Sequence, residues 1–536
     1  MGKNNRFGQK QLHFISSFLV LTALVFGLWQ RSAAQTCEVV VSPAVRDAEF
    51  DAIFTQNGPG QGLEPAGSAG WTGGDSTYSV GLPNGDTAFF FSDSYIGEYP
   101  AFEGDGTVTA NANGLRTRQS NCGPPICDPP TVLYRAHNSV VVRDHVTGTL
   151  RTLTGPKDVA GYSTSYFSPL LGAVTNTFFW MGDSAVVQTD AAGTKKLWVF
   201  LLEFNNAWEF KGTSVAQLSL PGLQIESIKS ITPALGTASP ISWGAAAWLE
   251  GEYGNRILYI YGMFSDNTIG KKRPFLARVN PDLGFDSAAD STNWTVWNGS
   301  DWVAGLGNAA PLIGAAGDPN NANDSISDEF SVKKIQTNSG TSYVLLGMDT
   351  TAPFGLWKDI TLYTSCSPQG PFSAKQIVYS TPETNSRKVP GMTDSESLAG
   401  GMFVYNPHLH PQFSSSNNIL ISYNSNASKS QDLLFADTYR PRFIRAQVNG
   451  LNTTVTVGGK VVTQNGSGNQ KTGVTMTSPD GTTKTVSTDE AGNYRFEGVF
   501  IGKTYTFQAF SKHEQFAPKT VKVLSAVNDL DFSALP

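Results

Sequence analysis

Charged residues are scarce in this chain of 536 residues, since Asp, Glu, Lys and Arg together make up 15% of it. Basic runs are lacking as well, and the formal net charge is −6. Four cations (Lys3, Arg6, Lys10 and Arg31) lie in the first 34 residues, so the remainder carries about −10. An acidic chain without a basic patch lacks the electrostatic footprint of a nucleic-acid-binding protein. We therefore exclude nucleic acid as a partner.

Long apolar runs are confined to the N-terminus. Lys3, Arg6 and Lys10 precede an apolar stretch from Phe14 to Trp29, and Ser32-Ala33-Ala34 offers a small-residue cleavage site. This pattern predicts a secretory signal peptide over residues 1–34 and a secreted or cell-surface protein; a retained N-terminal anchor is the alternative. No second segment is long and apolar enough to suggest a further membrane span.

Cysteine is rare, with four residues in all. Export favours disulfides over metal sites. Cys122 and Cys127 are close enough in sequence to clamp one tight loop, which leaves Cys37 and Cys366 as the other pair.

Aromatic residues reach 11% and glycine 54 residues, a composition that suits an all-β protein. Five times a short apolar strand runs into a small residue and then Asp or Asn. The five segments are Thr87–Asp93, Phe178–Asp183, Leu258–Gly262 with Asp266 beyond, Tyr343–Asp349 and Ile419–Asn424. A unit that recurs every 75 to 90 residues indicates a repeat architecture. We predict a five-bladed β-propeller over residues 35–446, with the polar strand ends gathered at one funnel.

The composition changes after Tyr439-Arg440-Pro441-Arg442-Phe443. From about Ala446 the chain consists of short strands rich in Thr and Val, separated by turn signals such as Asn465-Gly466 and Asp480-Gly481. This predicts a small prealbumin-like or immunoglobulin-like β-sandwich over residues 447–536. The run Thr488-Asp489-Glu490-Ala491-Gly492-Asn493-Tyr494-Arg495-Phe496 resembles the carboxypeptidase-regulatory-like accessory module. Such modules act as spacers or attachment domains, which implies a role at a cell surface or in a matrix.

The first repeat carries the sharpest signal for function. Pro83-Asn84-Gly85-Asp86 is a hairpin turn between two β-rich runs, and Asp75 and Asp93 are equidistant from Asn84. If the loop has three residues, the two Asp residues lie opposite each other, where side chains point to the same face. The hairpin therefore predicts two carboxylates together at the open end of the innermost strands, beside the bare backbone of Gly73-Gly74.

Paired carboxylates are the equipment of glycoside hydrolysis. Their repulsion raises one pKa, which gives one group that donates a proton and another that stays an anion. We predict Asp75 and Asp93 as the catalytic pair and Glu329 as a third carboxylate, an acid or a modulator of pKa. The structural alternative is that each Asp forms an Asx turn at its strand end.

Other polar or aromatic residues at strand starts and ends are candidates for substrate binding. They are Trp71, His137, Asn138, Asp183, Trp243, Asp328, His408, His410 and Arg442. Trp71 and Trp243 are candidate sugar-stacking platforms, with core packing as the alternative. His408 and His410 alternate on one strand, which makes a metal conceivable, but the sequence offers no third ligand. We therefore expect no catalytic cofactor and leave a structural calcium open.

Several motifs together resemble a bacterial family of five-bladed propellers. They include Thr72-Gly73-Gly74-Asp75, Leu82-Pro83-Asn84-Gly85, His137-Asn138-Ser139, Trp243-Gly244, Ser367–Phe372, His410-Pro411 and Ile421–Asn426. That family was long catalogued as a domain of unknown function and now includes endo-acting D-arabinofuranosidases. The resemblance spans roughly residues 65–446 and implies catalytic roles for Asp75 and Asp93. This chain has Phe91-Ser92-Asp93-Ser94 where a Gly-Asp-Thr-like sequence is expected, which puts the substrate in doubt more than the reaction class.

These observations predict a secreted glycoside hydrolase that cleaves furanosidic linkages, with an arabinofuranan-type polysaccharide as substrate. The alternative is a non-catalytic carbohydrate-binding or adhesion propeller whose funnel binds glycan. A polysaccharide lyase is a third option, for which the sequence identifies no Tyr or Lys base. The exact sugar, the linkage, endo or exo action and the stereochemical outcome stay open, the last because it depends on the carboxylate separation.

Overall fold

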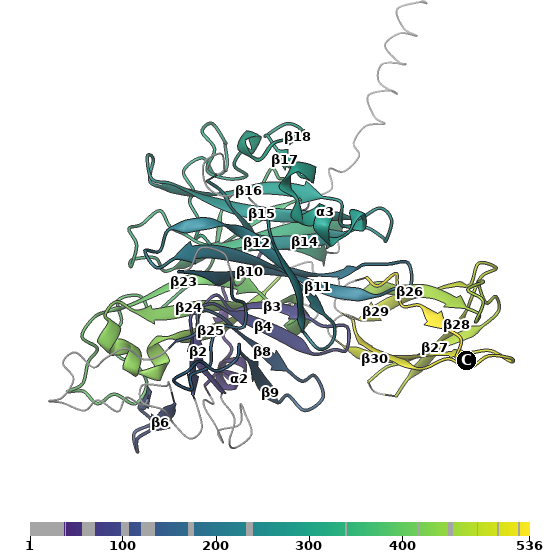
Figure 1. Ribbon diagram of the computed structural model, residues 1–536, viewed down its shortest axis with the longest axis horizontal. Helices are drawn as coiled ribbons and strands as arrows, with labels where there is room; N and C mark the ends of the chain where they lie inside the picture. Colours follow the sequence, from purple (N-terminus) through teal and green to yellow (C-terminus); the bar gives the residue numbers. More distant parts are fainter. Residues whose placement is uncertain are drawn as a thin grey trace, which may run out of the picture.

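A computed structural model describes residues 37, 39–55, 70–97, 107–118, 135–169, 176–231, 240–337, 340–414, 418–448, 454–479, 481–500, 503–523 and 526–535. The signal peptide and the Cys122–Cys127 pair predicted above lie outside these residues. The described part of the chain is nearly all-β (Figure 1). Within it, no helix has the length and apolar character needed to cross a membrane.

Five antiparallel sheets make up the larger part of the molecule, and each sheet runs from its first strand outward. The first contains β3 (Tyr78–Gly81), β4 (Thr87–Phe91), β8 (Ser139–Arg143) and β9 (Leu150–Leu153). The second contains β10 (Thr177–Gln188), β11 (Lys195–Asn205), β12 (Phe210–Ser219) and β13 (Ile225–Ser230). The third contains β14 (Ser242–Glu250), β15 (Ile257–Asp266), β16 (Lys271–Val279), β17 (Thr295–Trp297) and β18 (Trp302–Ala304).

The fourth sheet contains β19 (Ser331–Thr337), β20 (Gly340–Met348), β21 (Asp359–Ser365) and β22 (Gln376–Ser380). The fifth contains β23 (Met402–Leu409), β24 (Asn418–Ala427), β25 (Arg440–Gln447) and, at its outer edge, β1 (Val45–Arg46). Two short ribbons, β2 (Gly70–Gly74) with β5 (Ser94–Gly97) and β6 (Val108–Ala110) with β7 (Arg116–Arg118), extend the first sheet's connections. The helices α2 (Ala48–Ile53) and α3 (Phe285–Ala289) are short.

Adjacent sheets share hydrophobic clusters, which explains why no sheet could stand alone. One cluster joins the first sheet to the second through Phe90 and Val199, and further clusters join the second to the third, the third to the fourth and the fourth to the fifth. A fifth cluster joins the fifth sheet back to the first through Phe443 and Phe89. Burying both faces of each sheet against its neighbours is the packing logic of a repeat fold. The arrangement is β-propeller-like.

The first strands of the sheets face one another at the centre. β3 packs against β10, β10 against β14, β14 against β19, and β19 against β23. Between the first strands of the last and first sheets, the His408 ring on β23 has its centroid 4.0 Å from that of Tyr78 on β3. Polar groups at this centre therefore come from all five sheets. The ends of the first strands form the candidate site.

The N-terminal segment fastens the last sheet. β1 pairs with β25, so the outermost strand of the fifth sheet comes from the start of the chain. A disulfide joins Cys37 to Cys366, 329 residues apart in sequence, which confirms that predicted pair. Asp47 caps α2 by accepting a hydrogen bond from the Phe50 backbone N–H at 2.8 Å.

The predicted repeats are correct as strands, but their phase is not uniform. Thr87–Asp93, Leu258–Gly262, Tyr343–Asp349 and Ile419–Asn424 fall on second strands of their sheets, whereas Phe178–Asp183 lies in β10, a first strand. His137, expected to start an inner strand, precedes β8, the third strand of the first sheet. The first sheet carries long connections between β4 and β8, and these hide the repeat in the sequence.

The C-terminal residues form two further sheets around one hydrophobic cluster. One contains β28 (Thr483–Ser487), β27 (Gly473–Thr477), β30 (Thr504–Phe510) and β31 (Lys519–Lys522); the other contains β29 (Asn493–Phe500), β26 (Thr454–Val462) and β32 (Phe532–Ser533). Val457, Phe496 and Phe507 are fully buried between them. These sheets lie at the right of Figure 1, beside the first two sheets, and Lys195 on β11 pairs with Asp529 at 3.1 Å.

Candidate active site

The hairpin that carries Asp75 and Asp93 has the predicted register. Tyr78 pairs with Phe90 within β3 and β4, and Gly74 pairs with Ser94 where β2 meets β5. Asp75 and Asp93 therefore occupy opposite positions in the gap between the two ladders. The loop has three residues, because the Leu82 backbone N–H donates to the Asp86 carbonyl at 2.8 Å. Gly85 takes the left-handed conformation that such a loop needs, with φ of 94°.

The backbone after Asp75 is strained. Ser76 and Thr77 have φ of 69° and 60°, a region that residues with a Cβ rarely adopt, and both are fully buried. Asn424, the polar end of the fifth repeat, holds this turn by donating to the Gly74 carbonyl at 3.3 Å and to Thr77 Oγ1 at 3.0 Å. Strain of this kind persists only where the surroundings impose it, and it concentrates at functional sites.

The Asp75 carboxyl has one engaged oxygen and one that is not. Oδ2 accepts a hydrogen bond from the Tyr405 hydroxyl at 2.8 Å, whereas Oδ1 is buried and has no hydrogen-bond partner among the described residues. Burial, followed by repulsion from Asp93, raises the pKa of Asp75 to about 7, although the hydroxyls of Tyr405 and Tyr439 oppose the rise. Asp75 thus titrates near neutral pH.

Asp93 is held as an acceptor on both oxygens. Oδ2 lies 3.0 Å from a guanidinium nitrogen of Arg135. Oδ1 lies 2.9 Å from His137 Nδ1 and accepts from the Trp180 indole N–H at 3.3 Å. These are the partners of a carboxylate anion, and Asp93 in turn raises the pKa of Arg135 against the effect of burial. The two Asp residues of the hairpin therefore have distinct environments.

Glu329 precedes β19 and closes a hydrogen-bonded chain at the centre of the sheets. Its Oε1 lies 2.9 Å from Ser76 Oγ, which lies 2.6 Å from Ser92 Oγ. Its Oε2 lies 3.2 Å from His408 Nε2. Burial, and after it repulsion from Asp75, raises the pKa of Glu329 well above its usual range. Burial and the nearby Asp75 therefore both favour the protonated form of Glu329.

Ser331 connects His408 to the backbone of its own strand. The Leu409 backbone N–H donates to Ser331 Oγ at 3.0 Å, and Ser331 Oγ lies 3.2 Å from His408 Nδ1. Burial lowers the pKa of His408 well below its usual range, so the ring is neutral. His408 therefore contacts Glu329 as an uncharged ring.

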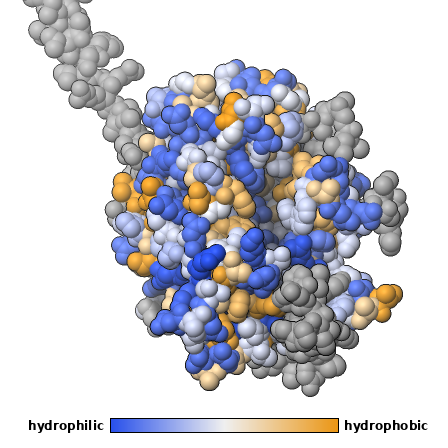
Figure 2. Space-filling view, turned by 90° about the vertical axis from the view of Figure 1, so that its left-hand side faces the viewer, coloured by the Kyte–Doolittle hydropathy of each residue, from blue (hydrophilic) through white to orange (hydrophobic). Residues whose placement is uncertain are grey.

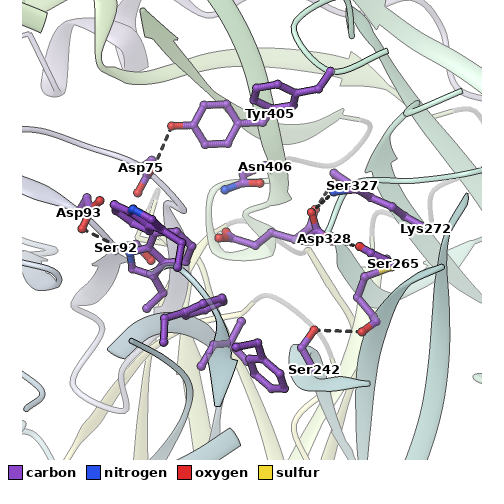
Figure 3. Close-up of a pocket in the computed structure, with 18 of the residues that line it drawn as sticks. Asp75, Ser92, Asp93, Ser242, Ser265, Lys272, Ser327, Asp328, Tyr405 and Asn406 are labelled. Atoms are coloured by element: carbon purple, nitrogen blue, oxygen red, sulfur yellow. Dashed lines mark hydrogen bonds and ion pairs between the residues drawn. The ribbon is translucent and has the colours of Figure 1, made fainter. Parts of the chain in front are cut away.

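Asp75, Asp93 and Glu329 line one cavity of about 590 Å³. It opens on the face opposite the C-terminal sheets, where Figure 2 shows a hollow among mixed hydrophobic and hydrophilic patches. Figure 3 places Asp75 and Asp93 side by side on one wall, with Tyr405 above Asp75. Asp328 lies across the cavity, where it pairs with Lys272 and accepts from Ser265 Oγ at 2.8 Å.

Aromatic side chains form much of the cavity wall, and sequence reasoning did not identify them. They are Trp180, Phe204, Trp208, Phe210, Phe354, Trp357, Phe403, Tyr405 and Tyr439. They come from strands of the second and fifth sheets and from connections within the second, fourth and fifth sheets. Trp180 and Tyr405 have a recognisable position in the fold. Each lies on an inner strand, β10 or β23, directly before a β-bulge.

Two predicted sugar-stacking platforms are wrong. Trp71 is 1% exposed, and its ring packs at 4.6 Å from Phe91 and 5.5 Å from Phe54. Trp243 is fully buried and packs edge-on against Trp294 at 6.1 Å. Each lies on the face of its strand that meets the neighbouring sheet, so neither ring reaches the cavity.

Several predicted binding residues are structural instead. The Asn138 side chain donates to the backbone carbonyls of Phe167 and Phe179, both at 2.9 Å. Asp183 pairs with Lys333 at 2.7 Å and accepts from the Ala247 N–H, which ties three inner strands together.

His410 and Arg442 also lie away from the cavity. His410 Nδ1 contacts Ser79 Oγ at 2.6 Å, and burial lowers the pKa of the ring to about 3. The Arg442 guanidinium is buried beside Asp437 and Glu383. Of the remaining predictions, His137 contacts Asp93 and stacks on Phe178 at 3.9 Å, His408 supports Glu329, and Asp328 lines the cavity.

The glycine pair before Asp75 serves packing and not ligand approach, which corrects the expectation of a bare backbone at the mouth. A Cβ on Gly73 would lie 1.9 Å from the Arg118 guanidinium, and one on Gly74 would lie 2.8 Å from the Trp71 indole nitrogen. Arg118 is buried and donates to the carbonyls of Thr72 and Tyr439 at 3.0 and 3.1 Å. Both glycines therefore let this buried arginine and Trp71 support the Asp75 segment.

Within the ranges that the structure describes, no three His, Cys, Asp or Glu side chains are grouped so as to hold a metal ion. His408 and His410 point to different partners, Glu329 and Ser79.

Comparison with solved structures returns similar folds at low identity. A protein from Bacteroides ovatus ATCC 8483, described as a proposed hydrolase, is 18% identical with a TM-score of 0.51, covering 76% of this chain and 93% of that one. Two further structures are more distant. An exo-β-1,3-galactanase from Phanerochaete chrysosporium is 9% identical with a TM-score of 0.36, covering 86% of this chain and 94% of that one. A GH43_1 enzyme from Xanthomonas citri is 12% identical with a TM-score of 0.36, covering 77% of this chain and 90% of that one. The first likeness extends to the fold alone, and TM-scores of 0.36 do not establish a common fold.

Comparison with curated proteins returns no match. The family described as a domain of unknown function, DUF5005, matches residues 66–449. This covers the five sheets apart from β1, together with the hairpin that bears Asp75 and Asp93. The chain belongs to the DUF5005 family.

Proposed function

We propose that this member of the DUF5005 family is a glycoside hydrolase whose working groups are Asp75 and Asp93. The observation that supports this most is the unequal pair itself. Asp75 has a free buried oxygen and a pKa of about 7, while Asp93 has both oxygens engaged by cationic or N–H donors. Glycosidases need one carboxyl that gives up a proton and one that stays an anion.

The environments suggest a role for each acid. Asp75 is the general acid, because a catalytic pKa works best near the operating pH. Asp93 is the anion, acting as base or nucleophile, and its charge keeps the Asp75 proton in place. The pKa of Glu329 is raised by burial, and Glu329 serves as a hydrogen-bonding partner beneath the pair.

The closed set of five inter-sheet clusters supports a five-bladed propeller, and the two C-terminal sheets around one cluster support a β-sandwich. The sandwich lies away from the cavity, which suits an attachment or spacer role at a cell surface. The Cys37–Cys366 disulfide supports export. The proposed substrate is a furanose polysaccharide of the arabinofuranan type, which rests on the resemblance in sequence.

A non-catalytic carbohydrate-binding propeller is the alternative, and an activity screen separates the two. The purified protein would be incubated with arabinan, arabinogalactan, galactan and xylan, and the products separated by chromatography. We expect new oligosaccharide products from at least one furanose polysaccharide. Binding without any new product, under conditions where the protein is folded, would favour the non-catalytic alternative.

A further inference from the structure

Trp208 stays half exposed although its ring contacts Phe178, Trp180 and the Arg135 guanidinium. It lies in the turn between β11 and β12, has φ of 64° and leaves half of its surface exposed. Asn205 holds this turn, because its side-chain oxygen accepts from the backbone N–H groups of Ala207 and Glu209, each at 3.0 Å. A bulky residue in the left-handed region with an exposed ring is costly in two ways, which points to a binding role.

Trp208 belongs to a continuous aromatic wall on one side of the carboxyls. The Trp208 wall consists of Trp180, Phe204, Trp208 and Phe210. Its ring centroids lie 5.3 Å apart for Trp180 and Trp208, and 4.6 Å apart for Trp180 and Phe204. Trp180 donates to Asp93, so this wall ends on one of the two carboxylates.

A second aromatic wall stands on the other side. The Phe354 wall consists of Phe354, Trp357, Phe403 and Tyr405. Successive ring centroids lie 5.0, 5.1 and 5.4 Å apart from Trp357 through Phe354 and Phe403 to Tyr405. Tyr405 donates to Asp75, so this wall ends on the other carboxyl. Phe354 is 67% exposed at its rim.

The charges that line the cavity restrict what fits between the walls. Its acids are Asp75, Asp93, Asp328 and Glu329, and its cations are Arg135 and Lys272. Arg135 already pairs with Asp93, and Lys272 with Asp328. Among the described residues, each lining cation is already paired with an acid, so an anionic ligand would find no cation of its own.

We propose that the Trp208 wall and the Phe354 wall are two sugar-stacking surfaces that hold a neutral glycan chain on opposite sides of the Asp75–Asp93 pair. This proposal deepens the proposed function, on which it rests for the position of the cleaved bond. It assigns Trp208 and Phe354 as binding residues and neutral glycans as the class of ligand. Flat apolar rings with a few fixed polar groups are the usual composition of such sites.

Calorimetric binding to the full chain carrying Asp75→Asn, which slows turnover, tests the proposal. The probes are α-1,5-linked arabinofuranosyl, β-1,4-linked xylosyl and β-1,3-linked galactosyl oligosaccharides of two to six units, with oligogalacturonates of equal length as anionic probes. Trp208→Ala and Phe354→Ala are compared with Phe510→Ala, which removes a ring of similar exposure from the C-terminal sheets.

We expect at least one neutral series to bind more tightly with length until both walls are filled. Each wall variant should then weaken binding of the longest probe about tenfold, as for an aromatic hot spot, while Phe510→Ala leaves it unchanged. Tighter binding of oligogalacturonates, unchanged affinity in both wall variants, or no binding of any neutral probe would overturn the proposal.

The two proposals fail in different ways. If the parent cleaves no glycan but binding depends on both walls, the sugar-stacking surfaces stand and the proposed hydrolase activity fails. If the parent cleaves a neutral glycan and both wall variants bind it as the parent does, the hydrolase stands and the surfaces fail. Thermal midpoints within a few degrees of the parent, as expected for exposed rings, show that the variants are folded.

Discussion

Asp75→Asn should stabilise the protein by an amount that grows with pH. The pKa of Asp75 is raised from 3.8 to about 7, so the folded state binds more protons than the unfolded state between these values. Stability is therefore lost as the pH rises through this window, and the loss is complete above about pH 7. A shift of about three units corresponds to roughly 4 kcal/mol as an upper bound. Asn carries no charge and removes this loss.

Urea unfolding at several pH values measures the effect. We expect Asp75→Asn to match the parent near pH 4 and to exceed it by about 2–4 kcal/mol at pH 8, because the opening of the cavity to water reduces the full value. On a cleaved glycan, kcat should fall about 10²–10⁴-fold, as expected for loss of a general acid. Asp328→Asn, on the opposite wall and paired with Lys272, is the control and should show no such pH-dependent gain. Equal stability differences at pH 4 and pH 8 would refute the reasoning.

Three further predictions concern the neighbours of this pair and the chain closure. Glu329→Gln should keep the free energy of unfolding within about 1 kcal/mol of the parent at pH 6. Glu329→Ala removes a hydrogen-bond partner of Ser76 and His408 and should lower it by about 1–3 kcal/mol. Equal losses for the two variants in urea unfolding would contradict a neutral Glu329. Arg135→Gln should raise the pKa of Asp75 further, because the guanidinium of the parent lowers that pKa. The alkaline limb of the pH profile of kcat/KM should therefore move to higher pH. A move to lower pH would contradict this effect of Arg135 on Asp75. Replacing Cys37 and Cys366 by Ser should lower the free energy of unfolding by roughly 2–5 kcal/mol in urea unfolding, and an unchanged value would contradict a stabilising disulfide.

The hairpin shows what the sequence can specify. The symmetric spacing of Asp75 and Asp93 about Asn84, with Gly85 for the left-handed turn, fixes the register locally, and the structure has that register. The C-terminal strands were also predictable, because alternation and turn signals act within a few residues. The Cys37–Cys366 pair followed by elimination.

It is harder to predict which side chains of a strand are buried. Each strand has one face toward the central axis or the cavity mouth and a second face toward a neighbouring sheet. Trp71 and Trp243 had the residue type of a sugar platform but lie on the packing faces. Asn138 and Asp183 likewise end strands whose polar groups tie neighbouring segments together. Sequence spacing distinguishes these faces only where it also shows which strand of its sheet a segment forms. Between residues 150 and 240 the spacing of the repeats does not show this.

The cavity walls were missed for a different reason. Trp208 and Phe354 lie in turns between strands, and they approach the carboxyls only because separate sheets converge. The raised pKa of Glu329 depends first on burial between the sheets and then on repulsion from Asp75, which is far from Glu329 in the sequence. Such a site is assembled by tertiary packing, so no local sequence pattern predicts it.

The central claim is that the Asp75–Asp93 pair hydrolyses a neutral glycan. The most direct test is the turnover of the best glycan substrate by the parent and by Asp93→Asn, a change that keeps size and removes the anion. The account predicts new oligosaccharide products from the parent and a fall in kcat of about 10²-fold or more in the folded variant. Turnover by folded Asp93→Asn equal to that of a clearly active parent would contradict it.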